Sequence, residues 1–161
     1  MGLCALFAAV ATLLFAWPNC AAAQTIDALN YSLDVKPQSL KIDTTRGPKT
    51  YKQTFTFTVI NTSKTSFAGL APSCQLFDIE VFREDSSGDE LVWKWSKTQN
   101  FCDKMTPVTI APGVRWQRLA IWEFAGPSLK GGQYKAVATF IPSHGKVAVE
   151  YKIESFVVTT E

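Results

Sequence analysis

The sequence predicts an all-β protein, an antiparallel immunoglobulin-like β-sandwich. Three observations lead to this prediction. Apolar and polar residues alternate with a period of two in several segments, turn sequences rich in Gly, Pro, Asn and Ser separate these segments, and helical periodicity is absent after residue 24. Eight or nine short strands separated by turns, in a chain of 161 residues, are typical of such a sandwich.

The clearest strand covers residues 51–59, where aromatic and β-branched residues such as Phe55 and Val59 alternate with Lys and Thr. It ends at the turn sequence 61–64, and Pro112-Gly113 marks another turn. The polar stretch 38–50 is predicted to be a long loop. The other predicted strands cover residues 29–35, 66–70, 75–84, 90–95, 106–110, 114–124, 134–141 and 146–159.

The composition is that of a globular domain and excludes several classes of protein. Hydrophobic residues make up 47% and charged residues 19%, which excludes a disordered chain, a collagen and a coiled coil. The formal net charge is only +2, whereas nucleic-acid binders carry many phosphate-binding Lys and Arg side chains. We therefore expect no nucleic-acid partner.

The N-terminal segment is predicted to be a signal peptide, residues 1–23, followed by a single β-sandwich domain, residues 24–161. Residues 3–17 are almost wholly apolar, and Ala21 and Ala23 form the small-residue pattern of a signal-peptidase site. The protein is therefore expected to be exported to the periplasm, the cell surface or the medium. The alternatives are an uncleaved membrane anchor, although the apolar run is short for a span, and a lipoprotein attached through Cys20. A membrane is expected as a partner only if the segment stays uncleaved.

Two cysteines lie in the predicted domain, Cys74 and Cys102. The residues between them read as a hairpin that turns at residues 85–89, and a hairpin centred on Ser87 places the two cysteines nearly opposite each other at its open end. Because an exported protein with one cysteine pair usually joins it, we predict a Cys74–Cys102 disulfide. The alternative is a pair of separate buried thiols. Two Cys and one His far apart in sequence do not match a zinc site.

Several segments together resemble the BsuPI family, the intracellular proteinase inhibitors of bacilli and their relatives. Val92-Trp93-Lys94-Trp95-Ser96, directly after the hairpin turn, is the most specific of them. The others are residues 55–63, 75–81, 110–113 with the following Trp122-Glu123, and 131–136. The resemblance covers residues 51–141, and it implies a β-sandwich that inhibits a serine protease of the subtilisin class through protein–protein binding.

If the inhibitor function holds, one loop must enter a protease cleft. The segment 97–107 is the best candidate, because the bond at Cys102 would hold one end and Pro107 would stiffen the other. The residues expected to bind are Asp103, Lys104, Met105 and Thr106. Met105 would suit the main pocket of a subtilisin-like protease, and Lys104 that of a trypsin-like one. The alternative is a connector that contacts no partner; the glycine-rich loop 125–133 is less preorganised.

Tryptophans allow a second functional hypothesis, an exported adhesion or assembly module that binds protein or glycan. Trp95 and Trp116 are the two expected near the surface, because each lies near the end of a predicted strand. Core packing between two sheets is the more ordinary role for such residues. A module of this kind could also bind a partner along a sheet edge, which requires no special residues.

Catalysis is not expected. His144 is the single histidine and lies in a turn sequence, and no nucleophile-elbow motif supplies a serine for it. Glu84, Asp85, Asp89 and Glu90 flank one turn, but their spacing does not match a calcium loop, so a solvated hairpin tip is the simpler interpretation. We therefore expect no enzyme activity, no cofactor and no metal.

Overall fold

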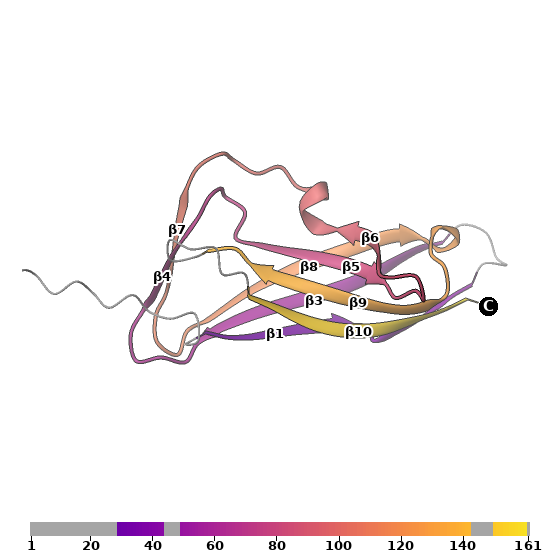
Figure 1. Ribbon diagram of the computed structural model, residues 1–161, viewed down its shortest axis with the longest axis horizontal. Coiled ribbons are helices and arrows are strands. Elements are labelled where there is room, and N and C mark those ends of the chain that lie inside the picture. The colour runs from indigo at the N-terminus through magenta and orange to yellow at the C-terminus, as the bar shows by residue number, and fades with distance from the viewer. Residues whose placement is uncertain (1–28, 44–48, 143–149, 161) are drawn as a thin grey trace, which may run out of the picture.

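The computed structural model describes residues 29–43, 49–142 and 150–160. The predicted signal peptide and His144 lie outside the described residues. The described part consists of strands and short 3-10 helices, and the predicted all-β fold is confirmed (Figure 1). Its strands are β1 (Leu29–Lys36), β2 (Ser39–Ile42), β3 (Thr50–Asn61), β4 (Phe67–Ala71), β5 (Phe77–Arg83), β6 (Glu90–Lys94), β7 (Thr106–Ile110), β8 (Arg115–Ala125), β9 (Gly132–Phe140) and β10 (Glu150–Thr160), with 3-10 helices η2 (Trp95–Thr98) and η3 (Gly126–Ser128).

The strands form a sandwich of two main sheets and a small ribbon. One sheet has the order β1-β3-β8, the other has the order β2-β10-β9-β5-β6, and β4 and β7 pair as a two-stranded sheet. Figure 1 shows the long strands of both main sheets running along the same axis, with β4 and β7 at one end. Aromatic rings of β3 meet those of β5 and β6 between the layers, so the core lies between the two main sheets.

Two details of the topology differ from the prediction. Residues 39–42, placed in a loop by the sequence, form β2, and β2 pairs in parallel with the end of β10, whereas an entirely antiparallel fold was expected. The physical reason is long-range pairing. Ile42 is buried and Leu40 is half-buried. Two apolar positions in a polar stretch are too few to predict a strand from the local sequence, because this strand depends on a partner far along the chain.

The strand alternation read from the sequence corresponds to the two faces of the three-stranded sheet. In β3, Phe55, Phe57 and Val59 are buried, and the intervening residues lie on the outer face. Phe57 lies opposite Leu33 of β1, and both side chains face the core. The residues of the core cluster are Leu29, Leu33, Val35, Ile42, Phe55, Phe57, Val59, Phe67, Phe77, Ile79, Val81, Val108, Ile110, Ala120, Trp122, Phe124, Leu129, Tyr134, Ala136, Ala138 and Phe140.

Asn61 fastens the predicted turn at the end of β3. Its amide Nδ2 donates to the carbonyl oxygens of Ile110, at 2.7 Å, and Thr65, at 2.8 Å, and its Oδ1 accepts from the backbone N–H of Ser63. The backbone of Asn61 also binds the predicted turn before β8, where Gly113 adopts a φ of 71° that favours glycine. Through its side chain and its backbone together, Asn61 therefore ties the ends of β3 and β7 to the start of β8.

Candidate functional site

The β5–β6 hairpin sets the base of the candidate loop. Glu80 lies opposite Lys94 and Val81 opposite Trp93, which is the register predicted from a turn centred on Ser87. A bulge between Val81 and Phe82 then shifts the register toward the turn. Both strands are shorter than predicted, since β5 begins at Phe77 and β6 ends at Lys94.

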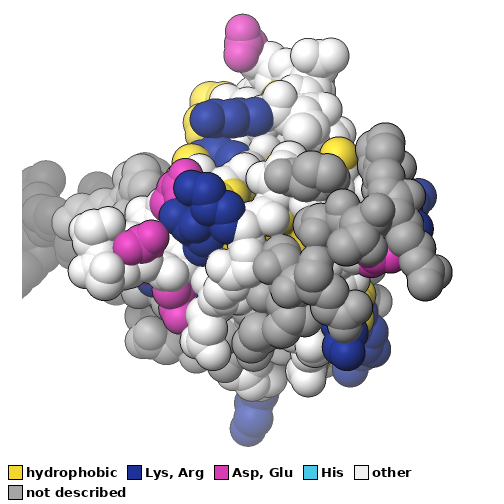
Figure 2. Space-filling view, turned by 90° about the vertical axis from the view of Figure 1, so that its right-hand side faces the viewer, with side chains coloured by type: hydrophobic (Ala, Val, Ile, Leu, Met, Phe, Trp, Pro, Cys, Tyr) yellow, Lys and Arg dark blue, Asp and Glu magenta, His cyan; other side chains and the backbone are white. Residues whose placement is uncertain are grey.

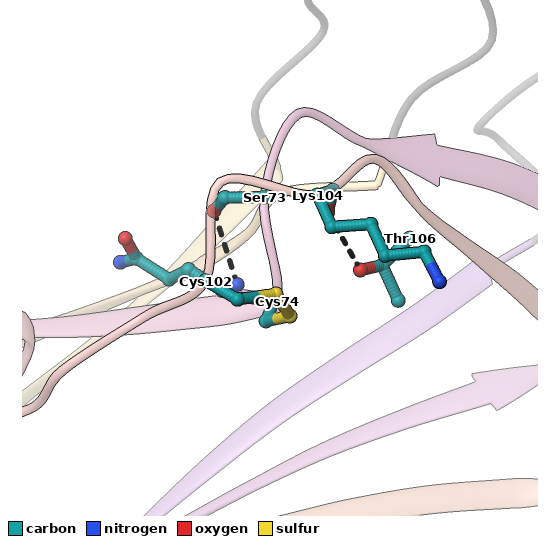
Figure 3. The surroundings of a disulfide bond; sticks show 6 residues. Ser73, Cys74, Cys102, Lys104 and Thr106 are labelled. Atoms are coloured by element: carbon teal, nitrogen blue, oxygen red, sulfur yellow. Dashed lines mark hydrogen bonds between the residues drawn. A yellow bond between two sulfur atoms is a disulfide. The ribbon is translucent and has the colours of Figure 1, made fainter.

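The predicted disulfide between Cys74 and Cys102 is present at the open end of this hairpin (Figure 3). The two Cα atoms are 5.4 Å apart, and the backbone N–H of Cys74 donates to the carbonyl oxygen of Cys102 at 3.2 Å. Both residues are exposed. The bond therefore closes the hairpin covalently at the protein surface, where the chain leaves toward β7.

Asp78 positions the chain that follows β6, a role that the sequence analysis did not predict. Its carboxylate accepts from the backbone N–H of Ser96 at 3.0 Å and from the Ser96 hydroxyl at 2.6 Å, and Lys94 Nζ lies 3.3 Å away. Asp78 is buried, so these bonds compensate the loss of water around the charge. They hold η2 against β5, and Trp95, predicted at a strand end, instead begins this 3-10 helix.

Trp95 and Trp116 are brought together through Phe77. The Trp95 ring stacks on Phe77 with centroids 4.2 Å apart, and Trp116 meets Phe77 edge-on at 6.0 Å. Both indoles are half-buried and pack against the core, and the Arg118 guanidinium lies 4.6 Å over the Trp116 ring. These contacts correspond to packing against the core, and both rings remain partly exposed.

A shallow pocket of about 380 Å³ lies beside the Trp95 ring. Phe101 meets Trp95 edge-on at 5.6 Å and forms one wall. The remaining lining residues are Cys74, Leu76, Phe77, Arg118 and Leu119. The pocket therefore separates the base of the candidate loop from strand β8.

The candidate loop itself is a short exposed apex between two fixed points. Cys102 is held by the disulfide, and Thr106 begins β7, where it pairs with Ala71 of β4. Between them, Asp103, Lys104 and Met105 are exposed, and Met105 has 59% of its surface accessible. The Thr106 hydroxyl donates to the carbonyl oxygen of Lys104 at 3.0 Å, bridging across Met105 (Figure 3). Of the four predicted residues, Asp103, Lys104 and Met105 thus form a continuous exposed segment, and Thr106 is half-buried where β7 begins.

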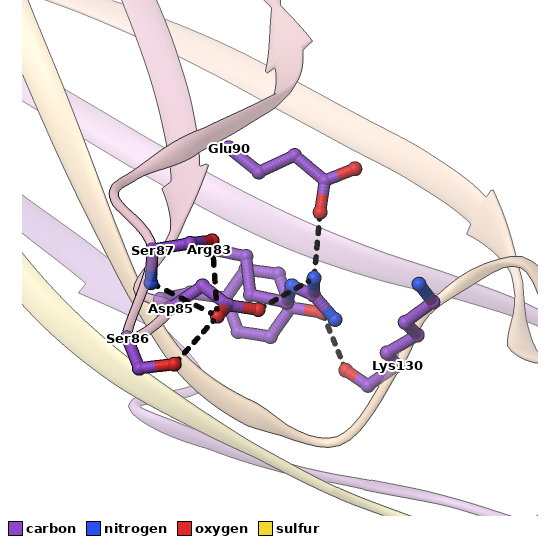
Figure 4. A network of polar contacts seen from close by, with 7 residues as sticks. Arg83, Asp85, Ser86, Ser87, Glu90 and Lys130 are labelled. Atoms are coloured by element: carbon purple, nitrogen blue, oxygen red, sulfur yellow. Dashed lines mark hydrogen bonds and ion pairs between the residues drawn. The ribbon is translucent and has the colours of Figure 1, made fainter.

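The acidic turn at the opposite end of the hairpin is neutralised by basic side chains (Figure 4). Arg83 Nη2 lies 3.1 Å from Asp85 and 2.7 Å from Glu90, and Lys135 pairs with Asp89. The backbone N–H of Ser87 and the Ser86 hydroxyl hold the pKa of Asp85 below its usual value. Figure 2 looks onto this end of the molecule and shows basic and acidic side chains next to each other. Among the described residues, no cluster of three or more metal-binding side chains is present.

Comparison with known families decides the assignment. A family model described as BsuPI, intracellular proteinase inhibitor, matches residues 39–144. The chain belongs to the BsuPI family. The match covers a longer range than residues 51–141, over which the sequence resembled this family. It includes β5, β6, the disulfide and the candidate loop. The family is one of inhibitors, which agrees with the expectation that the chain is not an enzyme. No curated protein matches the chain.

Solved structures that resemble this BsuPI-family chain are distant. Spo0M, the sporulation control protein of Bacillus subtilis, has 12% identity and a TM-score of 0.44, with 81% of this chain and 49% of that chain covered. A β-glucosidase from Erythrobacter marinus has 10% identity and a TM-score of 0.42, with 81% and 15% covered. A CARDB domain from Pyrococcus furiosus has 12% identity and a TM-score of 0.41, with 86% and 100% covered. The chain thus spans less than half of the first two, and similarity at this level carries no inference about function.

Within the described ranges, no helix has the length and apolar character needed to cross a membrane.

Proposed function

We propose that this BsuPI-family chain is an exported inhibitor of a serine protease of the subtilisin class, and that Asp103, Lys104, Met105 and Thr106 bind in the protease cleft. The observation that carries the proposal is the short exposed apex held at both ends, by the Cys74–Cys102 disulfide and by the pairing of Thr106 with Ala71. A segment fixed in this way loses little conformational freedom on binding to a protease. If the protease cuts the loop, its two new ends stay in place because both sides are held.

Met105 is the residue that we assign to the main specificity pocket. It is the most exposed large hydrophobic side chain of the described residues, and its flexible thioether can adapt to an apolar pocket. Lys104 next to it would instead suit a pocket with an acidic floor, as in trypsin-like proteases. The identity of the inhibited protease therefore reports which of the two side chains enters the cleft.

Export is supported by the apolar N-terminal segment with its small-residue cleavage pattern, and by an exposed disulfide, which persists in oxidising compartments. The test is the intact mass of the protein recovered after expression of the full-length chain. The mass of a chain that starts at Gln24 would support export with cleavage after Ala23. The mass of a chain that starts at Met1, found in the cytoplasmic fraction, would contradict export.

The inhibitory activity is tested by titrating this protein against a subtilisin and a trypsin. We expect saturable inhibition of subtilisin, and we expect Met105→Gly to raise the inhibition constant at least about 30-fold, the effect of losing a central side chain of an interface. Leu91→Gly is the matched control, because Leu91 is also an exposed apolar residue but lies on β6, away from the loop. Its inhibition constant should stay that of the wild type.

Inhibition that survives both Met105→Gly and Lys104→Gly would contradict the assignment of the loop. Absence of inhibition from a folded, oxidised protein would contradict the proposed function. The adhesion or assembly module would then be the better hypothesis, with a glycan or a protein other than a protease as its partner.

A further inference from the structure

Strand β8 is a long sheet edge. It pairs with β3 along its whole length, from Arg115 to Ala125, and within the described residues no strand pairs with its other side. Leu119 and Ile121 are 56% and 46% exposed on its outer face. Soluble proteins usually protect such edges, because unpaired backbone groups and apolar side chains attract another strand.

The hydrogen bonds at the two ends of β8 show which backbone groups point outward. Gly126 N–H donates to the Lys49 carbonyl oxygen at one end, and Asn61 N–H donates to the Val114 carbonyl oxygen at the other. Because bonding alternates along an antiparallel pair, the even-numbered residues of β8 bond to β3. The odd-numbered residues therefore direct their N–H and C=O groups to the open edge. The carbonyl of Gln117 agrees with this, since it accepts from the Arg118 side chain at 2.8 Å.

The side chains of these odd-numbered residues are complementary, in charge and in apolar character, to the same side chains of a second copy. If two β8 strands pair antiparallel with Leu119 opposite Leu119 of a second copy, Ile121 lies opposite Gln117. Arg115 then lies opposite Glu123, so two ion pairs form, one on each side of the two-fold axis. All these side chains are exposed on the outer face of the sheet. Within the described residues, the backbone groups that would bond are paired with no other strand, and the Gln117 carbonyl would exchange the Arg118 side chain for the second copy.

The other edge of the same side of the sandwich lacks these properties. Strand β6 is five residues long, its pairing is interrupted by a bulge, and it ends directly at η2. Short, bulged strands are poor templates for pairing. Strand β8 has eleven residues, contains no Pro, and pairs with β3 without a bulge, so it is a longer and more regular template.

We propose that β8 is the interface of a symmetric homodimer, in which two copies pair their β8 strands antiparallel about Leu119. The pairing joins two three-stranded sheets into one six-stranded sheet. Main-chain hydrogen bonds between odd-numbered residues provide the contact, and the two Arg115–Glu123 pairs fix its register. The inference does not depend on the inhibitory activity.

The first experiment measures the oligomeric state by sedimentation velocity over a range of concentrations, on protein purified after expression of the full-length chain. We expect a monomer–dimer equilibrium. Arg115→Glu should weaken the dimer about tenfold, because it replaces two attractive pairs by two repulsive ones. Adding Glu123→Arg to this variant should restore the dimer. Lys36→Glu is the matched control, since it makes the same charge change on β1, at the opposite edge of the sheet.

Glu123 also pairs with Lys52 of the same chain at 2.7 Å, so the thermal midpoint of each variant is measured to show that the fold is kept. A second experiment tests the register by oxidation. Leu119→Cys should form a disulfide-linked dimer, because directly opposite residues have Cα atoms about 5.5 Å apart, within the range of a disulfide. Ile121→Cys should not cross-link, since two such residues lie far apart along the paired strands.

A protein that stays monomeric at all concentrations would overturn the proposal. A dimer that is insensitive to Arg115→Glu, or that cross-links through position 121 in preference to position 119, would overturn it as well, because the copies would then meet through another surface or register.

Discussion

Removing the disulfide with Cys74→Ser and Cys102→Ser should lower the free energy of unfolding by about 3.5 kcal/mol. The two cysteines are 28 residues apart, and closing a loop of this size removes about 12 cal/mol/K of entropy from the unfolded chain. Both residues are exposed, so serine leaves no core cavity and little besides this entropy changes. The backbone bond from Cys74 to Cys102 and the β5–β6 ladder do not depend on the sulfur atoms.

Equilibrium unfolding in urea, followed by tryptophan fluorescence, measures this change. The dependence of the free energy on urea should also steepen, because the unfolded chain without the cross-link exposes more surface. Wild-type protein reduced with dithiothreitol is the control and should unfold like the double variant. A loss below about 1 kcal/mol would refute the reasoning, since it would mean that the hairpin restricts the unfolded chain as strongly as the bond does.

Two further changes test the packing and the charges around the loop base. Phe77→Ala should lower the free energy of unfolding, measured in urea, by about 4 kcal/mol, because the buried ring lies between Trp95 and Trp116. A loss below about 2 kcal/mol would contradict this, since the two indoles would then fill the space that the ring leaves. Glu80 accepts a hydrogen bond from Lys94 and raises the pKa of the Lys94 ammonium above its ordinary 10.5. The pair therefore contributes fully to stability below pH 10.5, and this contribution is lost as pH rises through the pKa of Lys94 in the folded protein. Thermal midpoints of wild type and Glu80→Gln should therefore differ at pH 7 and converge as pH rises beyond the folded pKa of Lys94, and a constant difference would contradict this role of Lys94.

The long strands could be predicted from the sequence because their faces are chemically distinct. Along β3, the residues Phe55, Phe57 and Val59 are buried, and the Thr residues between them face outward, so the alternation directly encodes the orientation. The disulfide followed from the same logic, because the turn at residues 85–89 fixed the register that brings Cys74 near Cys102. The immunoglobulin-like assignment within the sandwich class stays a prediction.

The features that escaped prediction depend on contacts between distant residues. Strand β2 exists because Leu40 and Ile42 reach the end of β10, more than a hundred residues away. The change from strand to 3-10 helix at Trp95 depends on Ser96, whose N–H and hydroxyl both bind Asp78. The available signal was an acidic residue inside an apolar strand, which requires a partner when it is buried.

The two proposed binding surfaces, the loop with Met105 and the edge of β8, are neighbours because one pocket lies between the loop base and β8. Leu119 at the centre of the β8 edge and Cys74 at the loop base line the same pocket, with Phe101 beside them. A second β8 strand would therefore run close to the base of each loop. Met105→Gly removes a side chain at the apex only, and Arg115→Glu changes a charge at the edge only. Because each variant changes one surface, inhibition and dimer formation can be assigned separately, even though one pocket joins the segments that carry them.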